Sequence, residues 1–189
     1  MAILRVAQLG HPVLRMVAEP VPVDLILSPG FQQFCDDLLE TMDEYDGAGL
    51  AAPQVHVSMR VVVLTLRSAD GPQFLINPEI EVLSDTTSRT WEGCLSVEGF
   101  RGLVERPDHI RVEAYDRDGE RIAFELRGFP AVVTQHECDH LDGVIYVDRV
   151  LPRSLMFVKE YRRWGPPEEY ADDDDYDDDE DYDDLDFEE

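Results

Sequence analysis

Cysteine is rare in this chain of 189 residues: the three present are an odd number, too few for the disulfide framework of a small secreted domain. The N-terminus lacks the basic region followed by a long apolar stretch that marks a secretory signal peptide. No apolar run in the sequence approaches the roughly 20 residues that cross a bilayer. These absences exclude a disulfide-stapled or membrane-spanning protein and predict a cytoplasmic one with no membrane partner.

Basic residues are also scarce, since 16 Lys and Arg face 42 Asp and Glu and give a net charge of −26. The imbalance is greatest at residues 168–189, which hold 16 acidic residues and no basic one, whereas residues 1–167 carry −10. Such a body has no obvious basic footprint for a phosphate backbone, so we expect no DNA partner, although a local basic patch is compatible with this composition. One folded domain is expected over residues 1–165. The acidic tail, 166–189, cannot bury a core and is expected to be disordered.

The pattern of apolar residues predicts an α+β fold. Helical spacing predicts helices over residues 31–42, 129–141 and 152–164. Runs rich in β-branched residues predict strands over residues 59–67, 74–83, 110–115, 122–126 and 144–150. The third and fourth strands flank an Asp-Arg-Asp-Gly turn and are expected to form a hairpin, while four prolines make residues 1–29 an extended arm with one helical turn. Because helices do not alternate with the strands, we expect α+β with antiparallel or mixed sheets.

Residues 136–140 read His-Glu-Cys-Asp-His, an H-E-x-x-H sequence on the helix expected over residues 129–141. Residues four apart share a helix face, so His136 and His140 can both face one metal ion. Glu137 lies one step round the helix, where a carboxylate can take a proton from water activated by the metal. The alternative is a pair of helix histidines that are hydrogen-bonded within the fold and bind no metal.

A hydrolytic metal site of this kind needs a third protein ligand and one open position. Downstream, the carboxylates within reach are Asp142 and Asp148. Upstream, Cys94 follows a glycine in Trp-Glu-Gly-Cys-Leu-Ser, residues 91–96, and is the better candidate because its thiolate can face the metal. The alternative for Cys94 is a small buried hydrophobe, the usual fate of a free cysteine.

A third segment, residues 47–54, reads Gly-Ala-Gly-Leu-Ala-Ala-Pro-Gln. Its small residues let another backbone approach closely, and the Gln54 amide offers two N–H donors to an oxyanion. Taken alone, the segment is equally explained as a turn after a helix.

In this order and roughly 40 residues apart, the three segments resemble the motifs of the peptide deformylase family, G-x-G-L-A-A-P-Q, E-G-C-L-S and Q-H-E-x-D-H-L. The likeness extends from Ile3 to about Val150, some four fifths of the chain. It implies a catalytic domain over residues 1–165, with antiparallel or mixed sheets around a central helix that carries the H-E-x-x-H motif.

The resemblance implies that Cys94, His136 and His140 hold the metal, usually Fe²⁺ in this family, with Zn²⁺, Ni²⁺ or Co²⁺ as substitutes. The implied reaction removes the N-formyl group from the initiator methionine of nascent polypeptides and releases formate. Metal-bound hydroxide would attack the formyl carbon, with Glu137 as general acid and base. The Gln54 amide and the Leu95 backbone N–H would stabilise the oxyanion.

N-formylmethionyl nascent peptides are therefore the implied partner. The resemblance suggests that Gly49 pairs through its backbone with the extended peptide. Val132 and Val133 are candidates for the pocket of the methionine side chain, with ordinary helix core as the alternative. Glu92 and Arg106 match a charged pair that braces the cysteine loop, with a surface ion pair as the alternative.

Two features depart from the family pattern. Glu98 stands where relatives often have proline, and the acidic tail stands where some bacterial relatives have a basic helix that docks on the ribosome. We therefore expect a monomer whose ribosome association, if any, is transient and does not use the tail. Two rival interpretations are an H-E-x-x-H peptidase, which would not need Cys94, and a non-catalytic relative whose tail binds a basic partner. Cys35 and Cys138 are expected to belong to the core.

Overall fold

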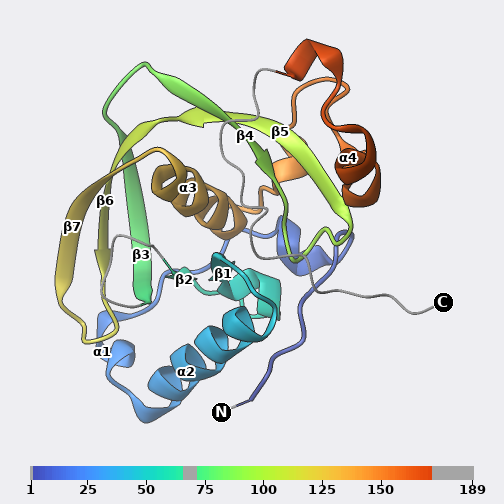
Figure 1. The fold of residues 1–189 in the computed structure, drawn as a ribbon. Coiled ribbons are helices and arrows are strands. Elements are labelled where there is room, and N and C mark those ends of the chain that lie inside the picture. The colour runs from blue at the N-terminus through green and yellow to red at the C-terminus, as the bar shows by residue number, and fades with distance from the viewer. Residues whose placement is uncertain (1, 66–71, 172–189) are drawn as a thin grey trace.

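The structure is a computed structural model that describes residues 2–65 and 72–171 (Figure 1). The helices are α1 (Val23–Ile26), α2 (Pro29–Glu44), α3 (Phe129–Leu141) and α4 (Val158–Trp164). The strands are β1 (Gly49–Ala51), β2 (Val61–Leu64), β3 (Gln73–Val82), β4 (Thr87–Glu92), β5 (Phe100–Pro107), β6 (His109–Tyr115), β7 (Arg121–Arg127) and β8 (Met156–Phe157). Short 3-10 helices cover Pro12–Arg15, Ala52–Val55, Tyr146–Asp148 and Glu168–Tyr170.

The strands form two antiparallel sheets, so the predicted α+β class is confirmed. A five-stranded sheet has the order β1-β2-β3-β6-β7, and a three-stranded sheet has the order β4-β5-β8. Every neighbouring pair in both sheets is antiparallel. No helix of the described residues is both long and apolar enough to cross a bilayer.

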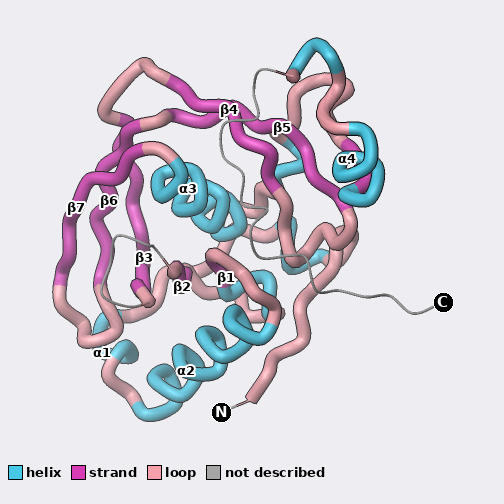
Figure 2. Tube along the Cα trace, in the orientation of Figure 1, coloured by secondary structure: helices cyan, strands magenta, loops and turns pink. Residues whose placement is uncertain are grey.

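Helix α3 contacts strands of both sheets, namely β1, β2 and β7 of the larger one and β5 of the smaller one. Nine of its 13 residues are buried, which explains why it shows no clear division into apolar and polar faces. Ala131, Val133 and Leu141 pack in a cluster with apolar side chains of the five-stranded sheet. Strands lie on more than one side of α3 (Figure 2), so the polar residues that it carries are held between layers.

Several predicted elements are confirmed. The hairpin pairs β6 with β7 over seven residues, from His109↔Arg127 to Tyr115↔Arg121. Helix α2 begins at Pro29, because the side chain of Ser28 caps it by accepting from the Phe31 N–H. The strand predicted over residues 59–67 is β2, and the end of that prediction lies outside the described residues.

Two predicted elements are wrong. Residues 144–150 do not form a strand but contain the 3-10 helix Tyr146–Asp148, because the Asp148 carboxylate accepts a hydrogen bond from the Ile145 N–H and closes a turn. The helix predicted from Pro152 starts only at Val158, since residues 156–157 first pair with β5. The strands β4 and β5 were not predicted as such.

The first residues of the predicted tail are ordered against the body. Residues 168–170 form a 3-10 helix, Tyr170 packs in a cluster with Trp91 and Tyr161, and its hydroxyl donates to the Pro152 carbonyl at 3.0 Å. Tyr170 thus supplies an apolar anchor that holds residues 166–171, the start of the predicted acidic tail, against the body. Residues 172–189 lie outside the described part of the chain.

Gly143, just past the end of α3, is a position where a side chain would be costly. Its φ is +73°, and a Cβ atom there would lie 2.8 Å from the backbone carbon of Arg15. We expect Gly143→Ala to lower the free energy of unfolding by about 1–3 kcal/mol, measured by urea denaturation. Gly119→Ala is the matched control, because φ is +80° there but the nearest atom, in Leu27, is 3.9 Å away. Equal losses for the two variants would show that the contact with Arg15 contributes nothing.

Candidate metal centre

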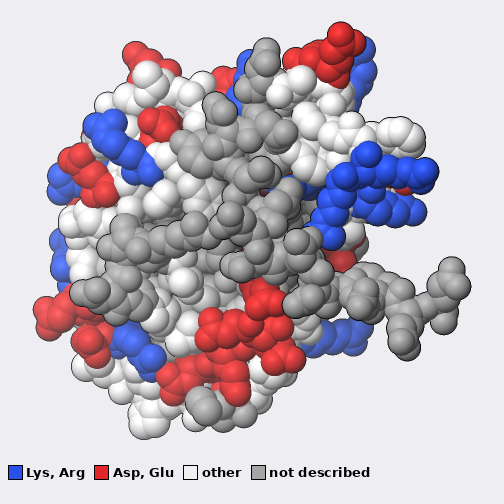
Figure 3. Space-filling view, viewed as in Figure 1, with Lys and Arg blue, Asp and Glu red and all other residues white. Residues whose placement is uncertain are grey.

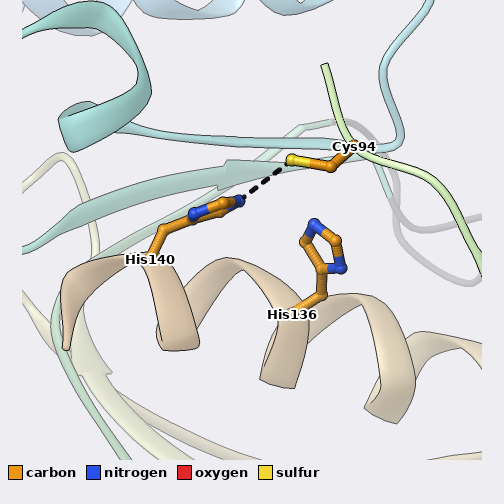
Figure 4. A group of neighbouring side chains, drawn as sticks. All are labelled: Cys94, His136 and His140. Atoms are coloured by element: carbon orange, nitrogen blue, oxygen red, sulfur yellow. Dashed lines mark hydrogen bonds between the residues drawn. The ribbon is translucent and has the colours of Figure 1, made fainter. Parts of the chain in front are cut away.

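Cys94, His136 and His140 meet at one point of the fold. Cys94 lies in the loop between β4 and β5, and both histidines lie on α3 (Figure 4). Their ligand atoms all lie within 4.8 Å of one another, and the Cys94 Sγ is 3.3 Å from the His140 Nε2. Sulfur and nitrogen ligands of a tetrahedral zinc-like site lie about 3.6 Å apart when metal–ligand bonds have their usual lengths. The three donors therefore fit a divalent ion of the iron-to-zinc series.

The local structure of the β4–β5 loop directs the cysteine towards α3. The antiparallel pairing ends at Glu92↔Gly102, so the chain must turn over residues 93–99. Within this turn the Val97 N–H donates to the Cys94 carbonyl at 2.8 Å, and the Ser96 N–H lies 3.4 Å from the Cys94 sulfur. These contacts fix the thiol at the end of the small sheet, opposite the two imidazoles.

Glu92 and Arg106 are buried, so the predicted charged pair is not a surface ion pair. The Arg106 Nε and Nη2 donate to the two carboxylate oxygens of Glu92 at 2.5 and 2.9 Å, a bidentate arrangement. Arg106 also donates to Asp139 on α3 at 2.8 Å, and Asp139 in turn accepts two hydrogen bonds from Arg149. Burial alone would raise the pKa of Glu92, but the hydrogen bonds from His136 and Arg106 lower it to about 2.

Glu92 also orients one of the candidate ligands. Its Oε2 lies 2.8 Å from the His136 Nδ1, so the opposite ring nitrogen faces the cysteine. Burial lowers the pKa of His136, but the hydrogen bonds to Cys94 and Glu92 outweigh it and raise that pKa well above its usual value. Burial and the charge of His136 hold the pKa of His140 well below its usual value, so His140 is neutral and able to bind a metal.

Removing the charge of Glu92 is expected to weaken metal binding rather than abolish it. We expect Glu92→Gln to raise the dissociation constant for Co²⁺ or Zn²⁺ about 10- to 100-fold, because His136 loses the carboxylate that orients it. Competition with a chelator of known affinity measures this. Glu105→Gln is the matched control, because Glu105 is also on a strand of the small sheet and pairs with an arginine, Arg89, but is exposed. An unchanged constant for Glu92→Gln would show that Glu92 does not orient the ligand.

Glu137 lies beside the three donors and points to β1. It is buried, and a Cβ atom placed on Gly49 would lie 2.7 Å from the Glu137 Cγ, so this glycine makes room for the carboxylate. Burial raises the pKa of Glu137 to about 7. Its Oε2 is buried without a hydrogen-bond partner among the described residues. A carboxyl group in this state can accept and release a proton near neutral pH.

Gln54 and Leu95 approach the same point from two other segments. The Gln54 Oε1 accepts from the Ala51 N–H at 2.8 Å, which turns its Nε2 towards the Cys94 sulfur at 3.5 Å and the Ser96 hydroxyl at 3.4 Å. The Leu95 side chain is partly buried against a core cluster, and its carbonyl accepts from Gln8 at 3.0 Å. Both residues therefore place backbone or amide groups next to the cysteine.

The remaining predicted residues fall into two groups. Val132 and Val133 are buried on α3, one turn before His136 and Glu137 respectively, and Val133 also belongs to the core cluster.

The downstream carboxylates are engaged elsewhere, because Asp142 pairs with Arg60 at 2.6 Å and Asp148 pairs with Arg15. Among the described residues, Cys94, His136 and His140 are the one group of three or more donors that fits a metal ion. Cys35 and Cys138 are buried, as expected.

Two contacts of the site were not predicted. Asp139 joins Arg106 to Arg149, although its place inside the H-E-x-x-H motif could have suggested a structural role. The buried ring of Tyr146 stacks on the His136 ring, with centroids 5.9 Å apart and an interplanar angle of 21°. Nothing in the local sequence indicates that contact, because Tyr146 reaches His136 only through the turn after α3.

Comparisons with known proteins show the family. Residues 3–155 match the family model described as polypeptide deformylase. A peptide deformylase of Stutzerimonas stutzeri (strain A1501) is 47% identical over 149 residues, which cover 78% of this chain and 87% of the relative. The chain belongs to the peptide deformylase family. It is a hydrolase that removes the formyl group from the N-terminus of nascent peptides.

Solved structures extend the similarity of this deformylase to its fold. The actinonin-bound class I type b peptide deformylase of Acinetobacter baumannii is 38% identical, has a TM-score of 0.75, and covers 80% of this chain and 100% of its own. The Met-Ala-Ser-bound structure from the same organism is 36% identical, has a TM-score of 0.75, and covers 79% of this chain and 99% of its own. The family is metal-dependent, and in this deformylase Cys94, His136 and His140 lie close enough together to hold a metal ion.

Proposed function

We propose that this deformylase holds Fe²⁺ through Cys94, His136 and His140, with Zn²⁺, Ni²⁺ or Co²⁺ as substitutes. The convergence of one sulfur and two ring nitrogens within 4.8 Å carries the proposal. In this assignment α3 is the central helix of a catalytic domain over residues 1–165, and residues 166–189 are an appendage. The bound ion supplies a Lewis acid and makes water acidic enough to ionise near neutral pH.

Glu137 is the proton carrier of the reaction. Its carboxylate takes a proton from the attacking water and delivers it to the amine that leaves when the formyl C–N bond breaks. Three features of its place in the structure support this role, which are its burial, its pKa of about 7 and the lack of a partner for Oε2 among the described residues. A fixed, desolvated carboxyl group that titrates near neutral pH suits both transfers.

Gln54 and Leu95 stabilise the negative charge that develops on the formyl oxygen. The Gln54 Nε2 is held near the Cys94 sulfur by the hydrogen bond between its Oε1 and the Ala51 N–H. The Leu95 backbone N–H is the next main-chain donor after Cys94. Donors that are already fixed before the reaction lower its barrier, because they need not reorient as charge develops.

The peptide substrate lies along β1. This strand is at the edge of the five-stranded sheet, so Gly49 can pair through its backbone with an extended chain. The Met-Ala-Ser complex of the A. baumannii relative supports binding of a peptide that starts with methionine. Val132 and Val133 extend the face of α3 that carries His136 and Glu137, and we assign them to the methionine pocket.

The nature of the substrate also indicates where in the cell this deformylase acts. Nascent formylated peptides occur where translation occurs, so we propose a cytoplasmic location. We further propose a monomer that meets nascent chains without docking on the ribosome through its acidic C-terminal segment, because the phosphate backbone of ribosomal RNA repels that segment.

The decisive experiment measures formate release from formyl-Met-Ala by the Fe²⁺- or Co²⁺-loaded chain under exclusion of oxygen. We expect turnover that a strong chelator abolishes and added Co²⁺ restores. Free Met-Ala is the second product. Release of free alanine instead would identify a peptidase, and binding of the dipeptide without turnover would identify a non-catalytic relative.

A further inference from the structure

A basic and aromatic surface stands out on this acidic protein. It is formed by one end of β5, by β8 and by α4, and we call it the α4 surface; its residues are Arg101, Phe157, Lys159, Arg162, Arg163 and Trp164. Figure 3 shows lysine and arginine side chains gathered where α4 lies, whereas acidic side chains gather over α2. The α4 surface is thus the opposite in sign to the chain as a whole, whose net charge is −26.

The cations of this surface lie against rings. Arg163 lies over the Trp164 ring at 4.9 Å, and Lys159 lies over the Phe157 ring at 5.4 Å. Trp164 is 70% exposed and Phe157 is 49% exposed. Within the described residues, the charges of Lys159 and Arg163 contact aromatic rings rather than carboxylates, unlike exposed arginines such as Arg121, which pairs with Glu113. Such a surface suits a strongly anionic ligand that also carries apolar or aromatic groups.

The chain contains one segment with this chemistry. Residues 172–189 include 14 acidic residues and no basic one, and the four others are Tyr176, Tyr182, Leu185 and Phe187. Carboxylates can pair with the exposed cations, and the interspersed rings can cover Phe157 and Trp164. The rest of the body carries a negative net charge, so it attracts this segment less than the α4 surface does.

The described chain also ends beside that surface. Tyr170 packs in the same cluster as Tyr161 of α4, and Arg101 lies over the Tyr161 ring at 4.8 Å. Glu169 pairs with Arg153 at 3.0 Å, which fixes the last described turn. An 18-residue chain that behaves as a random coil has a root-mean-square reach of roughly 23 Å. Tethering of that length gives an effective concentration in the millimolar range, so weak individual contacts suffice.

We propose that residues 172–189 dock on the α4 surface of the same molecule. The docked segment neutralises the α4 surface and so prevents that surface from binding other polyanions. This interaction is separate from deformylation, because the α4 surface contains none of the residues assigned to the metal, the proton transfer or the oxyanion.

Two-dimensional NMR of the full chain and of a chain ending at residue 171 tests the docking. A solved relative that aligns over 100% of its own length covers only 80% of this chain, so the fold forms without the segment. At about 20 mM salt we expect the indole signal of Trp164 and the amides of α4 to differ between the two chains. The amides of β7, which lies on the other side of the molecule from α4 (Figure 1), should not differ. Superimposable spectra would overturn the proposal.

The same segment added as a peptide gives the quantitative test. A synthetic peptide of residues 172–189 should bind the chain ending at 171, and Lys159→Glu with Arg163→Glu should raise its Kd at least about 10-fold. Arg121→Glu with Arg127→Glu, both exposed on β7, is the control and should change Kd less than about twofold. Formate release should stay unchanged in both double variants, which shows that they fold. Equal weakening by the two pairs, or binding of an oligouridine RNA but not of the peptide, would overturn the proposal.

Discussion

Replacing Glu137 with glutamine is expected to lower kcat for formate release by about 10³- to 10⁴-fold and to leave the metal content unchanged. Glutamine has nearly the same size and shape as glutamate, so it fits the space that Gly49 leaves for this side chain. It cannot, however, accept a proton from water or deliver one to the leaving amine. The substitution is therefore expected to remove proton transfer and to leave metal binding intact.

The environment of Glu137 makes this separation of effects testable. The carboxyl group is buried and Oε2 has no hydrogen-bond partner among the described residues, so the substitution breaks no contact of that atom. The neighbours His136 and His140 stay in place on the same helix. Activity and metal content should therefore respond independently, which they would not do if Glu137 were itself a ligand.

Kinetics and metal analysis must be measured on the same preparation. Asp142→Asn is the control, because it also removes a carboxylate at the C-terminal end of α3, but one that pairs with Arg60 at the surface. We expect the control to keep its kcat within about twofold. Loss of metal from Glu137→Gln would mean that Glu137 has a structural role at the site. A kcat near that of the unmodified enzyme would mean that another group carries the proton.

Local sequence was sufficient to predict the helix that carries His136 and His140. The bounds predicted for α3, residues 129–141, agree with the structure, because Gly128 and Gly143 mark its two ends in the sequence. The spacing of His136 and His140 then requires that both face one side of the helix. The cysteine was found because it lies in a short motif, although nothing local to it shows that it reaches α3.

Elements that depend on distant partners were harder to predict. Strand β4 has mostly exposed polar residues in its first half, and its stability comes from pairing with β5, for example between Arg89 and Glu105. The residues of β4 by themselves do not indicate that such a partner strand exists. The same applies to residues 144–150, whose β-branched composition indicates a strand, although the Asp148 carboxylate closes a turn with the Ile145 N–H.

The network of charged side chains beside the site could also not be predicted in full from the sequence. The resemblance to the family suggested the pair of Glu92 and Arg106 but left open whether it is buried. The structure places both in the interior and adds Asp139 and Arg149, so that β4, β5, α3 and the chain after α3 are joined through four side chains. Burial of a charge depends on which elements cover it, and that is a property of the whole fold.

Replacing Cys94 with alanine is expected to reduce bound metal from about one ion per chain to less than about 0.1, and to abolish formate release with it. The two remaining donors, His136 and His140, come from a single helix, and a site with two protein ligands binds these ions weakly. The Cys94 Sγ is 3.3 Å from the His140 Nε2, and no other group of three or more donors among the described residues fits a metal ion.

This variant also separates the two metal-dependent interpretations. An H-E-x-x-H peptidase would take its third ligand from a downstream residue and would keep its metal without Cys94. The downstream carboxylates Asp142 and Asp148 are paired with Arg60 and Arg15, which already argues against that role. Metal analysis after dialysis against buffer without metal measures the outcome directly. Full retention of metal would exclude Cys94 as a ligand.

Cys138→Ala provides the matched control for loss of a thiol near the site. Cys138 lies between the two histidines on α3, yet it is buried among other residues and is absent from the group of donors that fits a metal. Burial raises the pKa of its thiol, so it stays protonated and is a poor ligand. We expect this control to keep its metal and to lose only some stability. If both variants lost the metal equally, the loss would reflect disturbance of α3 and not removal of a ligand.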